Sequence, residues 1–372
     1  MTLNDVCEFI VDCPHSTAKD EGVGYPLIRT PNVGRGRLIL NDVHRVSEAA
    51  YQKRNLRATP QDDDLIMARE APAGNVAIIK NGEKVCLGQR TVLLRPDKTK
   101  VYPDYLAYYL LAPQQQYGLL GTANGATVAH VNIPVIKTLP VTLPSIERQK
   151  KAADILIAYD DLIENNQRQI KLLEEAAQRL YKEWFVDLRY PGHEKVPVVD
   201  GVPEGWEQKK VTDLLQIRYG KDHKSLADGN IPVYGSGGIM RKVKPILYSG
   251  ESVLIPRKGS LNNILFVDGD FWTIDTMFYS IPQMGNVAKY CYLFLSRLDM
   301  YSFNIGAAVP SMTVNILEGI DILLPNEQVL SMFENRMKQI FDQKKLLVKQ
   351  NEFASEARDR LLPKLMSGEI AF

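Results

Sequence analysis

The chain has 372 residues, of which 45% are hydrophobic and 24% are charged, a composition typical of a folded protein of two or three domains. Its 45 basic and 44 acidic side chains leave a net charge of +1, which neither requires nor excludes a nucleic-acid partner, because a basic face can be offset by an acidic back. No apolar run is long enough to span a membrane, the N-terminus lacks the basic start of a secretory signal, and the four cysteines have no paired spacing, so we expect a soluble, cytoplasmic protein with reduced thiols and no metal site.

Residues 1–144 are predicted to form the first domain, an irregular and strand-rich globule. Residues 64–69, 76–80 and 90–95 are short β-type runs bounded by Gly, Pro and Asn, and residues 104–111 have the pattern of a short amphipathic helix. Residues 30–57 are predicted to be a long surface loop rich in Arg and Lys. Its charges are either ordinary solvated groups or recognition residues, which loops of this length often carry.

Residues 145–187 are predicted to form one long helix. Between Ala152 and Trp184 the seam positions alternate by four and three residues, without an intervening Pro or Gly, which is the heptad pattern of a coiled coil. At 1.5 Å per residue the seam is roughly 48 Å long, a length typical of a spacer or an assembly surface. Its main members are Leu156, Tyr159, Ile163, Ile170, Leu173, Leu180 and Trp184.

Residues 188–325 are predicted to begin with a Pro/Gly-rich linker, 190–205, and to continue as a second globule up to Pro325. Residues 326–372 then repeat the long helix at an offset of 181, with the seam members Phe333, Met337, Ile340, Leu347, Leu361 and Leu365. The second seam also holds three polar residues, Lys344, Asn351 and Arg358. A seam of this composition needs a partner, and the first helix is the obvious one.

The two halves are related by an internal duplication. Residues 125–144 and 306–325 are identical at five of twenty positions, where about one identity is expected by chance; both contain the segment Gly-Ala-x-Val, at Gly125–Val128 and Gly306–Val309. Residues 64–69 and 252–257 align at an offset of 188, as do 74–79 and 262–267, and 286–295 takes the place of helix 104–111. The sequence therefore predicts an α+β fold of two strand-rich globules and two long antiparallel coiled-coil helices, related by a pseudo-twofold axis.

The sequence contains no convincing catalytic site. The Gly-rich segments 22–24, 34–36 and 235–238 do not follow a strand and open a helix, so turns are the better interpretation. The five histidines form no HExxH pattern, and there is no GxSxG elbow. The acidic run Asp62–Asp64 is interpreted as a solvated turn. No Pro-Pro dipeptide occurs, which excludes the Asn/Asp-Pro-Pro-aromatic motif of amino-methyltransferases.

Basic side chains in the two globules are more informative. Lys and Arg hold phosphates, and Arg can also hold guanine O6 and N7 bidentately. The DNA-binding candidates are Arg29, Arg35, Arg37, Arg54, Arg57, Arg69 and Arg90 in the first globule, and Lys221, Lys224, Arg241, Lys242, Arg257 and Lys258 in the second. We expect Arg29, Arg35, Arg37 and Arg69 to face one half of a DNA site, and Lys221, Arg241, Lys242 and Arg257 to face the other. Taken singly, each is as well explained as ordinary surface charge.

Three segments carry a family resemblance: Leu143-Pro144 with Gln149, the close of the first helix at Glu183-Trp184-Phe185, and Arg360–Ile370. There, and in its domain order, the whole chain resembles the specificity subunit of type I restriction–modification systems. The Pro203-Glu-Gly-Trp206 entry to the second globule also fits; the first globule lacks it, since Met1 aligns near Val211 or Thr212. The resemblance implies a non-catalytic subunit whose two target recognition domains each read half of a bipartite DNA site through the major groove.

The same resemblance implies partners. The two antiparallel helices set the separation of the half-sites, and two modification subunits dock on them and methylate adenine at N6 with S-adenosylmethionine. This chain itself needs no cofactor, and restriction subunits can add DNA translocation and cleavage. Two other function classes stay open: a single-chain endonuclease or methyltransferase with two DNA-binding lobes, and a structural coiled-coil protein whose globules bind proteins. Salt-dependent binding to duplex DNA would argue against the latter.

Overall fold

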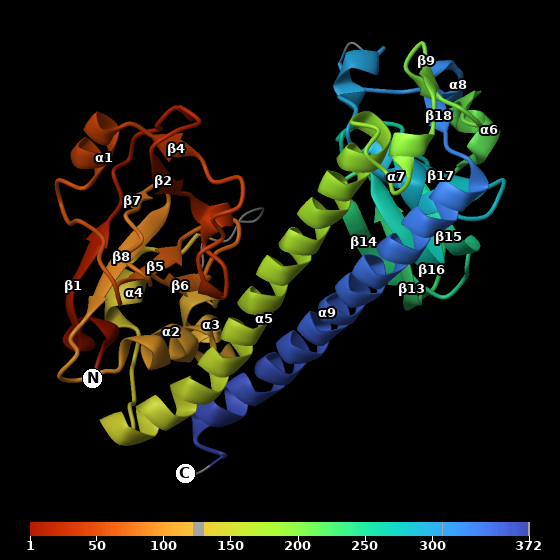
Figure 1. The fold of residues 1–372 in the computed structure, drawn as a ribbon. Coiled ribbons are helices and arrows are strands. Elements are labelled where there is room, and N and C mark those ends of the chain that lie inside the picture. Colours follow the sequence, from red (N-terminus) through yellow and green to blue (C-terminus); the bar gives the residue numbers. More distant parts are fainter. Residues whose placement is uncertain (122–129, 307, 371–372) are drawn as a thin grey trace. The chain divides into compact units, whose positions relative to one another are not determined.

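The structure, a computed structural model, describes residues 1–121, 130–306 and 308–370 and divides into two compact units (Figure 1). Unit 1 consists of Met1–Gln167 and Val348–Phe372, and unit 2 of Arg168–Leu347. Each unit therefore contains one globule and a segment of each long helix. The repeated segments Gly125–Val128 and Gly306–Val309 lie wholly or partly outside the described residues.

Unit 1 is built on a five-stranded sheet in the order β1-β8-β5-β6-β3. The strands of the whole unit are β1 (Cys7–Asp12), β2 (Tyr25–Ile28), β3 (Gly36–Arg37), β4 (Arg45–Val46), β5 (Leu65–Ala68), β6 (Val76–Ile78), β7 (Cys86–Leu87) and β8 (Thr91–Pro96). Of these, β4, β2 and β7 form a separate sheet in that order. The helices of the unit are η1 (Leu3–Val6), η2 (Thr30–Asn32), α1 (Glu48–Arg54), α2 (Pro103–Leu111), α3 (Pro113–Leu120), α4 (Ile133–Thr138) and the first part of α5 (Ile146–Tyr181). Figure 1 shows α2 and α3 at the same end of this unit as the N-terminus, and α1 at the other end.

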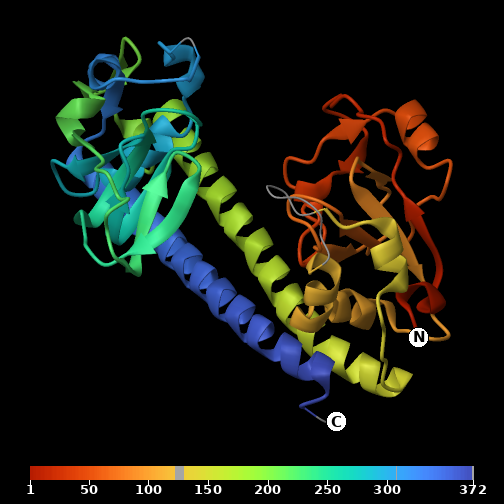
Figure 2. The same cartoon turned by 180° about the vertical axis from the view of Figure 1, so that it is seen from behind.

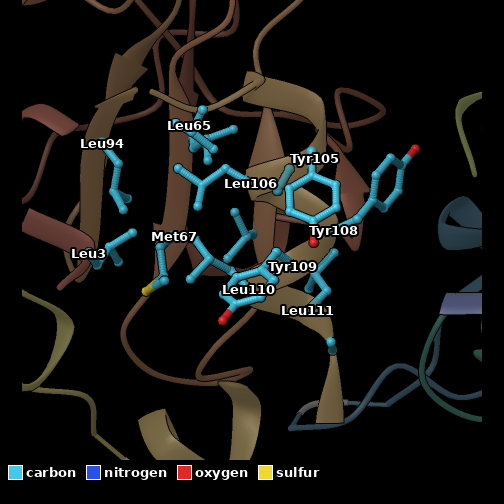
Figure 3. Packing of buried hydrophobic residues seen from close by; sticks show 14 of the residues in the cluster. Leu3, Leu65, Met67, Leu94, Tyr105, Leu106, Tyr108, Tyr109, Leu110 and Leu111 are labelled. Atoms are coloured by element: carbon cyan, nitrogen blue, oxygen red, sulfur yellow. The ribbon is translucent and has the colours of Figure 1, made fainter. Parts of the chain in front are cut away.

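Both faces of this sheet are covered, which explains why its central strands are continuously apolar. Leu65 and Met67 of β5 point into a cluster with α2, whereas the alternate residues Ile66 and Ala68 point into a second cluster beneath β2 and β7. Figure 3 shows Leu65 and Met67 against the side chains of α2, among them Leu106. The predicted strands 64–69, 76–80 and 90–95 are confirmed as β5, β6 and β8.

Two predictions for unit 1 need correction. Helix α2 has the expected bounds but is not amphipathic, because all nine of its residues are buried. Residues 30–57 are not a loop: they contain η2, β3, β4 and α1. Elements of two to seven residues are too short to produce a recognisable hydrophobic period, and their stability comes from packing against the sheet.

Unit 2 repeats the same plan with longer strands. Its strands are β9 (Val198–Val199), β10 (Val202–Pro203), β11 (Glu207–Lys210), β12 (Leu215–Tyr219), β13 (Asp228–Gly235), β14 (Gly238–Val243), β15 (Tyr248–Pro256), β16 (Leu265–Thr273), β17 (Met277–Pro282) and β18 (Asp321–Leu324). Its helical elements are the end of α5 with the π-helical turn Lys182–Val186, η4 (His193–Lys195), α6 (Val211–Leu214), α7 (Ala288–Leu295), η5 (Met300–Phe303), α8 (Val314–Gly319) and the first part of α9 (Glu327–Ser367).

The duplication is visible in the strand order. The unit 2 sheet runs β12-β17-β15-β16-β13-β14, so its first five strands match β1-β8-β5-β6-β3 one for one. In both sheets these neighbours are antiparallel except the last pair, β6 with β3 and β16 with β13. The first helical turn of each copy is also equivalent, because Asp5 caps η1 by accepting from Thr2 N at 2.7 Å and Asp213 caps α6 by accepting from Lys210 N at 2.8 Å. This match places Met1 at Lys209, which corrects the predicted alignment with Val211 or Thr212. The chain is therefore an α+β protein with two copies of one scaffold.

The long helices pair antiparallel within each unit, and both views show the segments of each pair side by side (Figures 1 and 2). In unit 1, Asp160 of α5 contacts Arg358 of α9. In unit 2, Glu174 contacts Lys344 and Trp184 packs on Phe333, so position numbers rise along α5 as they fall along α9. All thirteen apolar seam residues named from the sequence are buried or half-buried.

Candidate nucleic-acid interface

Arg54 lies inside unit 1, with 7% of its surface exposed. Its Nε donates to the Leu87 carbonyl at 2.7 Å and its Nη1 to the Ser16 carbonyl at 3.0 Å. A guanidinium fixed by backbone acceptors at the end of α1 holds the strand β7 and the 14–16 segment together. Arg54 therefore has a role within the fold, which argues against the DNA contact predicted for it from the sequence.

Arg37 is also turned toward protein. Its Nη2 donates to Asp161 of α5 at 3.1 Å, so this half-buried side chain joins the globule of unit 1 to the long helix. Arg35 is exposed and has one long contact, from Nη2 to the Leu111 carbonyl at 3.4 Å. Arg57 is exposed with contacts of similar length, and Arg29 is half-buried. Of the four residues expected to form one reading face, only Arg35 is fully available.

A charged network closes the end of the unit 1 sheet where β1 and β5 finish. Arg69, 8% exposed, donates from Nη1 to both oxygens of Asp12 at 3.0 and 3.1 Å, and its Nη2 lies 2.8 Å from Nε2 of His130. The other ring nitrogen of His130 lies 2.6 Å from Glu70, which also pairs with Arg90 at 2.8 Å. The donors of Arg69 are thus occupied by protein groups, which argues against its predicted DNA contact, while Arg90 stays at the surface.

The equivalent end of the unit 2 sheet is basic and aromatic. Arg257 lies over the ring of Tyr219 at 5.6 Å and donates to the Asp275 carbonyl at 2.9 Å. Tyr219 is 55% exposed, so the stacked pair presents a flat polar surface of a kind that proteins use against bases and phosphates. Arg241 differs, because it is held by Asp228 and by the carbonyls of His223 and Leu226.

The remaining basic candidates of unit 2 are exposed lysines. Among the described residues, none of the four has a side-chain ion pair within 4 Å: Lys221, Lys224, Lys242 and Lys258. Unpaired ammonium groups at a surface keep their full charge for a polyanion, so these four are the most available cations of the original set.

The acidic residues that follow residue 61 form ion pairs that stabilise the unit 1 globule. Asp64 is 2% exposed and binds Arg95 through both oxygens at 2.8 and 2.7 Å, and Asp63 accepts from Lys80 and Lys98. Asp62 and Asp63 form the predicted turn, but Asp64 is buried rather than solvated and Asp63 is half-buried, because Arg95 pairs with Asp64 and Lys80 and Lys98 pair with Asp63. Within the described ranges no group of three or more His, Cys, Asp or Glu could hold a metal ion. No helix there is long and apolar enough to cross a bilayer.

The sequence matches the family model described as the type I restriction modification DNA specificity domain, over residues 1–175 and 203–347. The two matched regions cover most of the chain and correspond to the two copies of the scaffold. The chain belongs to this DNA specificity family. The resemblance inferred from the helix motifs is thereby confirmed, and the single-chain modifying enzyme is not favoured, because the family supplies DNA recognition and not catalysis.

Individual relatives of this specificity subunit agree. It is 28% identical over 356 residues to the type I restriction enzyme MjaIX specificity subunit of Methanocaldococcus jannaschii, covering 87% of this chain and 81% of that one. It is 21% identical to the HindI specificity subunit of Haemophilus influenzae, covering 92% and 94%. In fold it is similar to the crystal structure of a type I S subunit from M. genitalium, with a TM-score of 0.56 and 17% identity over 98% and 95% of the two chains.

In this specificity subunit the helix seam of unit 1 is interrupted by polar layers. Asp160, with 4% of its side chain exposed, accepts from Arg358 Nη1 and from the Tyr108 hydroxyl, both at 2.6 Å. Burial raises the pKa of Tyr108 far above its usual value and the Asp160 carboxylate raises it further, so the phenol stays protonated and donates. One turn and a half along the seam, Asn166 donates to Asn351 at 3.0 Å.

These layers set the register of the two helices. The buried Asp160–Arg358 ion pair forms in one alignment only, since a shift by one heptad would place Asp160 against Leu365 or Asn351 and leave its carboxylate without a cation. The polar seam residues noted in the sequence, Lys344, Asn351 and Arg358, each find a partner on α5: Glu174, Asn166 and Asp160.

Sequence reasoning missed four residues of the sheet ends: Asp12, Glu70, His130 and Tyr219. None belongs to a motif, and three of them are acidic or neutral, so a search for basic groups passes over them. The duplication pairs Glu70 with Lys258 and His130 with Ser311 in sequence, but it does not bring His130 to Arg69. The structure does so in both copies, because Val131 N donates to the Arg69 carbonyl as Met312 N donates to that of Arg257.

Proposed function

We propose that each unit of this specificity subunit reads one half of a bipartite DNA site through the major groove. The observation that carries this proposal is that one scaffold occurs twice, with matching strand order and different side chains at the same sheet end. Two copies of one scaffold can engage two successive segments of a duplex, and different side chains at equivalent positions select different bases.

Unit 2 supplies the clearest cationic surface for this role. Its exposed Lys221, Lys242 and Lys258 have no ion pair in the described part of the chain, and Arg257 with Tyr219 lies on the same sheet end as Lys258. The lysines position the phosphate backbone, and Nε and Nη2 of Arg257, which have no acceptor among the described residues, can donate to base edges.

We further propose that the long helices set the distance between the half-sites and hold two modification subunits. The outer faces of the helices are not uniformly charged: Leu172 of unit 2 is 64% exposed, and Phe353 of unit 1 is 59% exposed. Apolar side chains exposed on these helices would leave water when a partner covers them, which favours docking there. The modification subunits would contribute S-adenosylmethionine and transfer its methyl group to adenine N6, in the cytoplasm where the DNA is.

Binding measurements test the reading surface. A complex of the chain with its modification subunit is titrated with a duplex library in which both half-sites are randomised, at several salt concentrations. Lys221→Ala combined with Lys242→Ala should weaken binding to all sequences and flatten the salt dependence by about one ion per lost phosphate contact. The control Lys195→Ala, an exposed lysine of η4, should change neither. Unaltered affinity and salt slope in the double variant would contradict the assignment.

Co-purification tests the docking surface. Leu172→Glu and Phe353→Glu should reduce the amount of modification subunit retained by the tagged chain, because a charge would be buried on association. Val23→Glu is the matched control, since Val23 is 74% exposed in the unit 1 globule. Equal retention by all three variants would place the modification subunits elsewhere. The purified chain alone should transfer no labelled methyl group to DNA.

A further inference from the structure

Arg90 is an exposed arginine whose guanidinium, in the part of the chain that the structure describes, is held at a single nitrogen. Its Nη1 lies 2.8 Å from Glu70 Oε2, and 63% of its side chain is exposed. Its backbone has φ of +64°, a left-handed conformation that non-glycine residues rarely adopt. A strained backbone that presents a tethered, outward side chain is more typical of a ligand contact than of a packing contact.

Glu70 is itself fixed by a chain of hydrogen bonds. Arg69 Nη2 can only donate, so Nε2 of His130, 2.8 Å away, accepts, and the ring proton is on Nδ1. That proton is donated to Glu70 Oε1 at 2.6 Å. Arg69 in turn is locked by both oxygens of Asp12. The Glu70 carboxylate that holds Arg90 therefore has one orientation, because His130 holds it, Arg69 holds His130 and Asp12 holds Arg69.

Among the described residues, the other edge of the Arg90 guanidinium has no protein partner. Because Nη1 is used by Glu70, the remaining parallel donors are Nε–H and one N–H of Nη2. Two parallel N–H groups match the O6 and N7 acceptors of guanine in the major groove, and they match no other base in the same way. Holding the side chain before DNA arrives also removes much of the rotamer entropy that such a contact costs.

At the equivalent sheet end, unit 2 has different side chains from those of the Arg90 network. Arg257 occupies the position of Arg69, because Arg257 N donates to the Thr276 carbonyl as Arg69 N donates to that of Arg90. The position of Arg90 is thus taken by Thr276, and Arg257 itself is the outward group, stacked on Tyr219. The other network members are also replaced: Asp12, Glu70 and His130 by Tyr219, Lys258 and Ser311.

We propose that Arg90 reads a guanine in the half-site bound by unit 1, and that Glu70, His130, Arg69 and Asp12 are positioning residues that aim it. This inference rests on the proposed reading of one half-site by each unit. Equivalent positions of the two units carry side chains of different chemical types, and this supports the proposal. Two units that read different half-sites must differ in the side chains that contact the bases. Lysines or an exposed Arg without a fixed orientation would add affinity for any DNA sequence. A guanidinium whose two parallel N–H donors are oriented by a carboxylate can instead select one base.

The test uses the full chain in complex with its modification subunit and a duplex library randomised in both half-sites. The wild-type complex should select guanine at one or more positions of the unit 1 half-site. Arg90→Ala and Arg90→Lys should both lose the preference at one of these guanines, by roughly 5- to 100-fold, and keep the other half-site unchanged. Arg90→Lys separates the fork from the charge, because Lys retains the charge but not the two parallel donors.

Modified DNA identifies the contacted atom. Replacing that guanine by 7-deazaguanine removes the N7 acceptor without changing base pairing, so it should weaken the wild-type complex and leave the Arg90→Ala complex unaffected. Glu70→Gln should reduce the guanine preference while leaving the midpoint of thermal unfolding nearly unchanged, which a merely structural role would not do. Lys98→Ala is the matched control: Lys98 is 61% exposed, ion-paired, and lies at the other end of β8.

Three results would overturn the proposal. One is an unchanged base preference in Arg90→Ala; another is uniform weakening on all sequences with a flatter salt slope, the signature of a phosphate contact. The third is a 7-deazaguanine penalty that persists in Arg90→Ala. Failure of the proposed function looks different, because the wild-type complex would then show no selected bases at the unit 1 half-site at all.

Discussion

Arg358→Ala should destabilise unit 1 by about 3 kcal/mol. Asp160 has 4% of its side chain exposed and Arg358 has 17%, so removal of the guanidinium leaves a buried carboxylate with the Tyr108 hydroxyl as its remaining partner. Breaking a buried ion pair from one side costs about 3–5 kcal/mol, and the lower end applies because water can enter where Arg358 was partly exposed. For a unit of this size the midpoint of thermal unfolding should fall by roughly 6–12 °C.

The assay follows unfolding by far-ultraviolet circular dichroism and by tryptophan fluorescence in parallel. All three tryptophans, Trp184, Trp206 and Trp272, lie in unit 2, so the fluorescence transition should shift less than the dichroism transition. Arg360→Ala is the control, because Arg360 is 78% exposed in an i,i+4 pair whose loss costs a few tenths of a kcal/mol. The combined replacement Asp160→Leu with Arg358→Leu should cost less than Arg358→Ala alone, since no unpaired charge remains. The reasoning is refuted if Arg358→Ala matches the control, or if the double variant is the less stable of the two.

Three further outcomes are expected. Gly36→Ala should lower the stability of unit 1 by at least about 1 kcal/mol in chemical denaturation, because Gly36 has φ of +95° and a Cβ there would lie 2.9 Å from Asp160 Oδ2; a neutral result would mean that the backbone relaxes. Hydrogen bonds from the Thr99 hydroxyl and from Lys100 lower the pKa of Asp97 to about 2, so its contribution to stability is present above pH 3.8 and is lost as the pH falls toward 2. The stability difference between wild type and Asp97→Asn should therefore shrink across that window, and a constant difference would refute the attribution. The four cysteines are buried, and burial raises the pKa of Cys7 to about 12 and of Cys86 to about 11, so at pH 8 none should react quickly with a thiol reagent before unfolding; a fast stoichiometric reaction would disprove this.

The two long helices were predictable from the sequence, because their apolar residues follow a heptad repeat over many turns. The seam from Leu156 to Trp184 and its copy at Phe333 follow directly from apolar spacing, which decides helix and face together. The strands at 64–69 and 90–95 were equally clear, because an apolar run flanked by Gly and Pro has few alternatives. The duplication further predicted that both halves of the chain have the same fold.

The site was less predictable, because charge type does not tell which way a side chain points. Arg54 and Arg69 have the composition of DNA contacts, yet acceptors brought from distant segments hold them inside the protein. Arg37 was assigned to a loop, but it meets Asp161, 124 residues away on α5. Such pairings depend on the tertiary arrangement, and a basic residue count contains no information about them.

The most direct test of the central claim is a map of methylated adenines in a plasmid library, with the modification subunit present and this chain either supplied or omitted. The account predicts a gapped motif of two short specified segments, methylated only when the chain is supplied. Arg90→Ala should relax one position of one segment, and Lys221→Ala with Lys242→Ala should lower the yield at every site. An ungapped motif, or the same motif without the chain, would contradict the conclusion that this chain supplies DNA specificity through two separate reading units.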